Sequence, residues 1–457
     1  MEKTIAAIST GIVKAGIGIV RMSGVSAISI GEKIFKSKSQ TPITEDINKK
    51  LLFGHIYDED SMVDEVLISF MYGPNTYTCE DMVEIYCHGS TISLRKILDL
   101  VLKEGADLAG PGEFTKRAFL NGRLDLSQAE AVSDLINAQT ESLYENSLNQ
   151  LRGSLSSEIR TLREKAQTVL AQIEVYINFS EDEEYIETED LRPHLEELRS
   201  SIKGLIDSSS QGRLIKDGLK VIIMGKPNVG KSSLLNALLR ENRAIVTDIP
   251  GTTRDVIEEV IEIDSIPVRL IDTAGIRDTK DEVERLGVER SISLSQDADL
   301  LVGVFDGSRA LDEEDEKILD LMDGKKSIAL VNKRDLERKT GPEDILSRAK
   351  SIKIIESSIK EGLGVEELKG EISSMFFLGD IEVGDSLIIT NSRQVDLLKK
   401  ALRSLEEGLE ALDMGMDLEM VEVDIRSTWL YLASITGENM DTESLLDQIF
   451  GEFCIGK

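Results

Sequence analysis

The sequence predicts a multidomain protein of mixed α/β and α+β class, in which an α/β domain is inserted into a helical domain. Its 457 residues suit roughly three domains, at about 150 residues each. Hydrophobic residues make up 41% and charged residues 30%, which is typical of a globular protein. The hydrophobic period switches repeatedly along the chain, and each switch predicts a domain boundary.

Residues 1–119 consist of short apolar runs separated by turns, which predicts an α+β module. Strands are expected at 4–8, 18–21, 66–70 and 82–86, and a helix at 92–102. In 120–216 and again in 379–457, apolar residues recur three and four positions apart. These stretches are expected to be long helices that form the two halves of one domain. The acidic run at 181–190 is expected to be a solvated loop or helix end.

Charge and cysteine content exclude several classes of protein. The chain has 84 acidic and 53 basic residues and a net charge of −31, which repels a phosphate backbone and excludes a general nucleic-acid coat protein. Its three cysteines match neither a zinc ribbon nor a secreted disulfide framework. The sequence lacks a signal-peptide pattern and long apolar runs, so a cytoplasmic protein without membrane contact is expected.

Residues 217–378 alternate strand and helix patterns, and their first turn carries a phosphate-binding motif. Residues 225–232 read Gly-Lys-Pro-Asn-Val-Gly-Lys-Ser, between an expected strand at 219–224 and a helix at 233–239. In this motif the backbone amides hold phosphate oxygens at a helix N-terminus. Lys231 is expected to reach the β- and γ-phosphates, and the Ser232 hydroxyl to bind magnesium.

Three later segments indicate which base is bound. Asp272-Thr-Ala-Gly275, Asn332-Lys-Arg-Asp335 and Ser357-Ser358 each follow an expected strand, at 268–271, 327–331 and 352–356. Their order and spacing resemble the guanine-specific elements of the Ras-like GTPase superfamily. There the aspartate matching Asp335 accepts hydrogen bonds from guanine N1 and N2, which adenine cannot offer. GTP is therefore the expected nucleotide.

The segment from Thr247 to Asp255 lies where that superfamily has its first switch, with Thr253 as the magnesium-binding hydroxyl. A plain Pro-Gly turn is the competing interpretation. Ile276 stands where Ras has its water-orienting glutamine, so another group must orient the water. Glu284 is a candidate, and an exposed helix acid is its alternative interpretation. The residues predicted to bind GTP are Asn228, Val229, Gly230, Lys231, Ser232, Ser233, Thr247, Asp248, Ile249, Pro250, Gly251, Thr252, Thr253, Asp272, Thr273, Ala274, Gly275, Asn332, Lys333, Asp335, Ser357 and Ser358.

Nearly the whole chain resembles the tRNA modification GTPase MnmE (TrmE) family. Residues 18–24, 112–122, 124–130, the inserted GTPase domain and the terminal Cys-Ile-Gly-Lys carry the resemblance. It implies a homodimer, held largely by its N-terminal modules, that works with the FAD-containing MnmG (GidA) protein in a heterotetramer or larger complex. The implied activity adds an aminomethyl or carboxymethylaminomethyl group to carbon 5 of the wobble uridine of certain tRNAs.

The resemblance also implies ligand sites. A tetrahydrofolate derivative, in the 5-formyl or methylene form, supplies the carbon and is expected in the N-terminal module. A potassium ion beside the phosphates is expected when two GTPase domains meet. The implied folate residues are Arg21, Glu84, Arg123 (Lys in many members) and Lys457; the potassium ligands are Asn228, Thr247, Ile249 and Thr252; the catalytic residues are Glu284, Lys231 and Cys454, the last in a redox or covalent role.

A competing hypothesis is an RNA-associated GTPase switch in ribosome assembly, without modification chemistry of its own. The N-terminal module and the terminal cysteine favour the modification enzyme. A basic RNA-binding tail, which would favour the switch, is not seen in the sequence.

Overall fold

The structure is a computed structural model with two compact units. One comprises Met1–Ile136, Leu148–Arg199 and Lys400–Lys457, and the other Asn137–Ser147 and Ser200–Lys399. The multidomain α/β and α+β class is confirmed, whereas the domain boundaries expected at 119, 216 and 378 stay predictions. The described residues are 3–39, 43–179, 191–241, 258–264, 266–272, 298–349, 352–376, 387–438, 443–451 and 453–456.

The first unit begins with a seven-stranded sheet of order β3-β4-β5-β6-β2-β1-β7. Its pairs are antiparallel except β1 with β7. The four expected strands are confirmed as β1, β2, β5 and β6, whereas β3, β4 and β7 were not predicted. The strands are β1 (Ile5–Ile8), β2 (Ile17–Ser23), β3 (Phe35–Ser37), β4 (Leu51–Asp58), β5 (Ser61–Met71), β6 (Met82–His88) and β7 (Asp107–Leu108).

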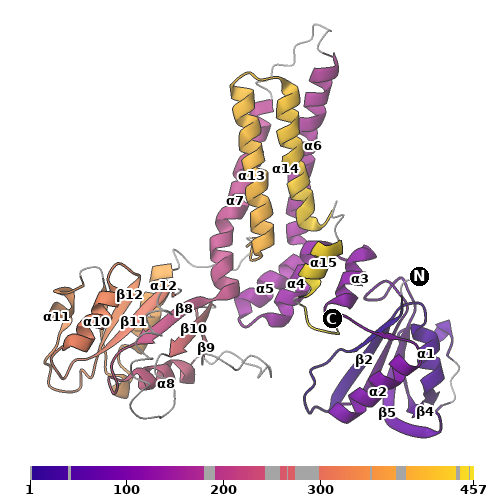
Figure 1. Ribbon diagram of the computed structural model, residues 1–457, viewed down its shortest axis with the longest axis horizontal. Coiled ribbons are helices and arrows are strands. Elements are labelled where there is room, and N and C mark those ends of the chain that lie inside the picture. The colour runs from indigo at the N-terminus through magenta and orange to yellow at the C-terminus, as the bar shows by residue number, and fades with distance from the viewer. Residues whose placement is uncertain are drawn as a thin grey trace. The chain divides into compact units, whose positions relative to one another are not determined.

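Helices α1 (Ala27–Ile34) and α2 (Thr91–Lys103) cover one face of this sheet (Figure 1). Alternate residues of β5, including Ile68 and Phe70, are buried beneath them, because successive strand side chains point to opposite faces. The Ser90 hydroxyl caps α2 by accepting a hydrogen bond from the Ser93 amide at 3.0 Å. The predicted helix at 92–102 is thereby confirmed as α2.

The two expected helical halves pack together in the first unit. Helix α6 (Ser154–Phe179) precedes the insertion and α14 (Leu418–Thr436) follows it, and the two lie side by side (Figure 1). The Arg163 guanidinium on α6 lies 4.6 Å from the ring centre of Trp429 on α14. A discontinuous helical domain is therefore confirmed. The first unit also contains α3 (Glu113–Leu120), α15 (Glu443–Gly451) and, apart from its last residue, α4 (Leu126–Asn137). Three more helices have residues in both units: α5 (Glu141–Leu151), α7 (Leu191–Asp217) and α13 (Ser392–Asp413).

No helix in the described ranges is both long and apolar enough to cross a membrane. The acidic run at 181–190 lies outside the described residues.

The second unit contains a six-stranded sheet of order β13-β12-β11-β8-β10-β9, parallel except for β9. Helices α8 (Lys231–Glu241) and α12 (Val365–Phe376) pack on one face, and α10 (Glu313–Met322) and α11 (Pro342–Leu346) on the other. The carboxyl ends of the parallel strands share one edge, where α/β folds bind ligands. The strands are β8 (Leu219–Met224), β9 (Glu258–Ile263), β10 (Ile266–Asp272), β11 (Leu300–Asp306), β12 (Ser327–Asn332) and β13 (Lys353–Glu356).

Candidate nucleotide site and N-terminal cluster

The phosphate-binding motif forms the turn between β8 and α8, as its residue types predict. The backbone takes positive φ values at Gly225 (154°), Asn228 (62°) and Gly230 (114°). A Cβ added to Gly230 would lie 2.3 Å from Asn332 Nδ2, so only glycine fits there. Strand β8 is buried on both faces, which fixes the position of the turn at the edge of the sheet.

Lys231 begins α8 and its side chain folds back over the turn. Its ammonium donates to the carbonyl oxygens of Gly225 at 2.5 Å and Lys226 at 2.7 Å. Lys231 is buried, whereas Ser232, Ser233 and Asn228 are exposed. The structure thus gathers the residues of the predicted phosphate site, with Lys231 held inside the loop that would surround the phosphates.

Asn332, at the end of β12, links the phosphate loop to the guanine motif. Its Nδ2 donates to the carbonyl of Val229 at 2.8 Å, and its Oδ1 accepts from the Ile359 amide at 3.1 Å and the Ser357 hydroxyl at 3.4 Å. Asn332 is 5% exposed, so each of these bonds is shielded from water. One buried amide therefore ties together three loops at the carboxyl edge of the sheet.

The predicted base-reading residue is positioned by the last of these loops. Ser358, itself buried, donates from its hydroxyl to Asp335 Oδ1 at 2.9 Å. Asp335 is exposed and its carboxylate has acceptor capacity left for a ligand. The arrangement suits a base that offers two adjacent N–H donors.

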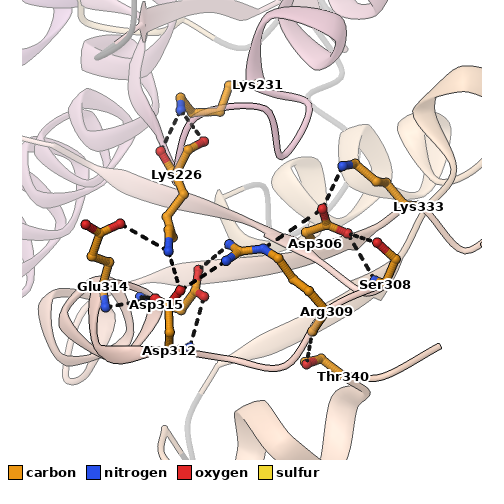
Figure 2. Close-up of polar contacts among 11 residues, drawn as sticks. Lys226, Lys231, Asp306, Ser308, Arg309, Asp312, Glu314, Asp315, Lys333 and Thr340 are labelled. Carbon is orange, nitrogen blue, oxygen red and sulfur yellow. Dashed lines mark hydrogen bonds and ion pairs between the residues drawn. The ribbon is translucent and has the colours of Figure 1, made fainter. Parts of the chain in front are cut away.

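A charged network surrounds these loops, and its importance was missed from the sequence. Lys333 Nζ lies 2.6 Å from Asp306 Oδ2, and Lys226 pairs with Asp312 and with Glu314, the latter at 3.1 Å (Figure 2). Burial alone would raise the pKa of Asp306, but hydrogen bonds from Lys333 and Ser308 lower it. The hydrogen bond from Lys226 lowers the pKa of Asp312 to about 2.

Several predicted site residues cannot be placed in this geometry. Asp272 ends β10, and its backbone lies beside β8. The remaining switch residues and the proposed water-orienting acid lie outside the described residues. These are Thr247, Asp248, Ile249, Pro250, Gly251, Thr252, Thr253, Thr273, Ala274, Gly275 and Glu284.

A second set of predicted residues gathers on the N-terminal sheet. Arg21 on β2 and Glu84 on β6 are direct cross-strand partners, with Arg21 Nε and Nη2 at 2.8 and 2.7 Å from Glu84 Oε1. The Tyr86 hydroxyl donates to Glu84 Oε2 at 2.5 Å. Burial and this bond to Glu84 raise the pKa of Tyr86 to about 12. The Glu84 carboxylate is thus held between a cation and a phenol.

Tyr77 joins Arg123 to this pair. The guanidinium carbon of Arg123 lies 4.5 Å from the centre of the Tyr77 ring, and that of Arg21 lies 5.6 Å from it. Both distances suit cation–π contact. Arg123 Nη1 also donates to the Tyr77 carbonyl at 3.3 Å. Tyr77 was missed from the sequence, where its position in a Gly-Pro loop was the only signal.

The C-terminal tail also contacts this module. The Gly112 amide donates to the Cys454 carbonyl at 3.3 Å, and Ile455 forms an isolated β-bridge with Pro111. A Cβ on Gly456 would lie 2.3 Å from the Ile8 carbonyl oxygen. Ile8 lies on β1 and pairs with Val20 of β2, the neighbour of Arg21, so the tail reaches the strand beside the one that carries Arg21. Cys454 is exposed, and Lys457 lies outside the described residues.

A phosphate loop and a guanine motif at the carboxyl edge of a largely parallel sheet define a class, the P-loop GTPases. Family models described as the MnmE helical domain and the GTP-binding protein TrmE N-terminus match residues 126–454 and 4–123. The tRNA modification GTPase MnmE of Clostridioides difficile strain 630 is 50% identical over 458 residues, and that of Finegoldia magna is 49% identical over 458 residues, with 100% of each chain covered. The chain therefore belongs to the MnmE family of tRNA modification GTPases.

Among solved structures, the G domain of the T. maritima FeoB iron transporter is 29% identical to this chain. It covers 34% of this chain and 97% of its own, with a TM-score of 0.26.

Proposed function

We propose that this chain hydrolyses GTP to drive modification of carbon 5 of the wobble uridine in certain tRNAs, in the cytoplasm. The added group is aminomethyl or carboxymethylaminomethyl. The observation that carries the proposal is the link made by Asn332 between phosphate loop and guanine motif, in a chain that matches tRNA modification GTPases over its whole length. These full-length relatives favour modification over a ribosome-assembly switch.

At the nucleotide, magnesium and potassium would offset the charge that develops on the phosphates. The exposed Ser232 hydroxyl at the start of α8 is an oxygen ligand of the kind magnesium prefers. The exposed Asn228 side chain, on a left-handed residue of the loop, offers potassium an amide oxygen. In the proposal Thr253 completes the magnesium site, Thr247, Ile249 and Thr252 complete the potassium site, and Glu284 orients the attacking water.

In the N-terminal cluster, the proposed ligand is a tetrahydrofolate derivative in the 5-formyl or methylene form. Bound there, it would supply the one-carbon unit. The donor set fits this ligand, because Arg21, Arg123 and Lys457 suit its glutamate carboxylates and Glu84 can accept hydrogen bonds from the pterin. Arg21 is already oriented by Glu84 and Tyr77. Cys454, exposed on the neighbouring tail, is proposed to act in the same chemistry.

The proposed assembly is a homodimer that binds the FAD-containing MnmG (GidA) protein in a heterotetramer or larger complex, with tRNA as substrate. The face of β4 and β5 that points away from α1 and α2 supports a dimer contact in the N-terminal module. It exposes Leu51 (57%), Phe53 (41%) and Leu67 (40%), and Phe53 pairs directly with Leu67. Exposed apolar side chains grouped in this way are typical of protein interfaces.

The proposal is tested by reconstitution. Unmodified tRNA is incubated with the chain, the FAD-containing partner, GTP and a methylene folate, with glycine or ammonium, and its nucleosides are analysed by mass spectrometry. A wobble uridine heavier by the added group is expected, and a Lys231→Ala variant should abolish it. GTP hydrolysis without any new nucleoside would support the ribosome-assembly switch instead.

A further inference from the structure

Asp306, at the carboxyl end of β11, holds the lysine of the guanine motif. Its Oδ2 lies 2.6 Å from Lys333 Nζ, and its Oδ1 accepts from the Ser308 amide at 3.0 Å and the Ser308 hydroxyl at 2.7 Å. Asp306 is buried, so the ion pair is only partly screened by water. Lys333 has a left-handed backbone with φ of 68°, an unfavourable conformation that its neighbours must stabilise.

Arg309 connects Asp306 to the start of α10. Its Nη1 donates to Asp312 Oδ2 at 3.2 Å and its Nη2 to Asp315 Oδ1 at 3.1 Å, while its Nε lies 3.9 Å from Asp306 Oδ2 (Figure 2). The Arg309 carbonyl accepts from the buried Thr340 hydroxyl at 2.6 Å. One guanidinium therefore faces three carboxylates, and its planar fork of N–H donors suits that arrangement better than the single ammonium of a lysine.

The same carboxylates reach the phosphate loop. Lys226, the second residue of the motif, pairs with Asp312 and with Glu314. Asp312 is also the N-cap of α10 and forms a capping box with Asp315. A continuous series of charged side chains thus runs from the phosphate loop, through the loop after β11, to the guanine motif.

We propose that Asp306 and Arg309 are positioning residues for the guanine nucleotide: they hold Lys333 and, through Asp312, Lys226, so that the phosphate loop and the guanine motif move as one. This inference rests on the proposed nucleotide site and assigns residues outside its motifs. Neither side chain contacts the nucleotide in this proposal. Their effect is on the positions of two loops that do.

Disrupting the network should weaken nucleotide binding without slowing hydrolysis at saturation. Asp306→Asn removes the charge that holds Lys333 and keeps the side-chain size and one acceptor. The loss is partial, because water can replace part of the interaction that Asp306 makes with Lys333. We expect GDP affinity to fall about tenfold, which corresponds to about 1.4 kcal/mol.

The experiment measures GDP affinity with a fluorescent analogue, KM and kcat for GTP, and melting temperature with and without GDP, using the full chain. Asp306→Asn and Arg309→Met should each raise Kd and KM about tenfold with kcat unchanged. Arg309→Lys should recover part of the loss. The double variant should bind GDP little more weakly than either single variant, because the effects of substitutions within one network do not add.

A control is Arg348→Met, which breaks the 2.8 Å ion pair between Arg348 and Glu316 of α10, outside the network. It should leave GDP affinity unchanged. A purely structural role would lower the nucleotide-free melting temperature but preserve the stabilisation by GDP, and that result overturns the inference. Additive losses in the double variant also overturn it. If Arg309→Met does not fold, the GDP affinity of Asp306→Asn alone tests the inference. Failure of the wild-type chain to bind GDP would overturn the proposed function as well.

Discussion

Gly230→Ala probes a contact on which the proposed nucleotide site depends. Gly230 has φ of 114°, and an added Cβ would meet Asn332 Nδ2 at 2.3 Å, the atom that donates to the Val229 carbonyl. Backbone strain at such a φ costs about 1–3 kcal/mol, and leaving the buried carbonyl without its donor costs about 1–3 kcal/mol more. Where this total of about 2–6 kcal/mol destabilises the GDP-bound protein, GDP affinity falls at least about 30-fold.

Gly324→Ala is the matched control. Gly324 also has a positive φ, 73°, but an added Cβ would meet nothing within 4 Å. It should therefore cost only the left-handed backbone penalty of about 1–2 kcal/mol and leave GDP binding intact. Titration with fluorescent GDP, together with melting of both variants without nucleotide, separates affinity from stability. Equal GDP affinity in the two variants would refute the role given to the contact between Gly230 and Asn332.

Three further predictions concern the base, the thiols and the N-terminal cluster. Asp335→Asn should shift turnover from GTP toward XTP, because an amide can donate to the xanthine oxygen that replaces the guanine amino group; unchanged GTP preference would contradict this. At pH 8, alkylation should modify exposed Cys454 well before Cys87, whose thiol pKa is raised to about 11 chiefly by burial, as peptide mass spectrometry would show. Tyr86 contributes stability that is present below pH 10 and lost as pH rises toward its folded pKa of about 12. Glu84→Gln should lower that pKa. The titration of Tyr86 is isolated by subtracting the ultraviolet titration of a Tyr86→Phe variant, and an unchanged Tyr86 titration in Glu84→Gln would contradict the assignment.

Local patterns were sufficient to predict the elements that carry the proposed nucleotide site. Strand β8 coincides with the strand predicted at 219–224, because a short apolar run followed by a glycine-rich turn is typical of a buried strand. The resemblance to Ras-like GTPases predicted that Asn332 belongs to a guanine motif. Its role as a link to Val229 was not predicted, since 103 positions separate the two residues and only the sheet brings them together.

The charged network and Tyr77 could not be predicted for a similar reason. Asp306 ends β11, Arg309 lies in the loop that follows and Asp312 caps α10, and at such positions charged residues are usually solvated. These residues form a network only because the parallel strand order β12-β11-β8 places the loops after these strands at one edge of the sheet. Strand β4 was missed because its exposed apolar residues blur the alternation expected of a half-buried strand.

The most direct test is GTP turnover by the purified chain in potassium chloride against sodium chloride, at equal ionic strength with magnesium present. The proposed potassium site predicts turnover that depends strongly on potassium, and an Asn228→Ala variant that loses this dependence. Equal rates in the two salts would contradict hydrolysis by paired, potassium-bound GTPase domains and leave a GTP-binding switch.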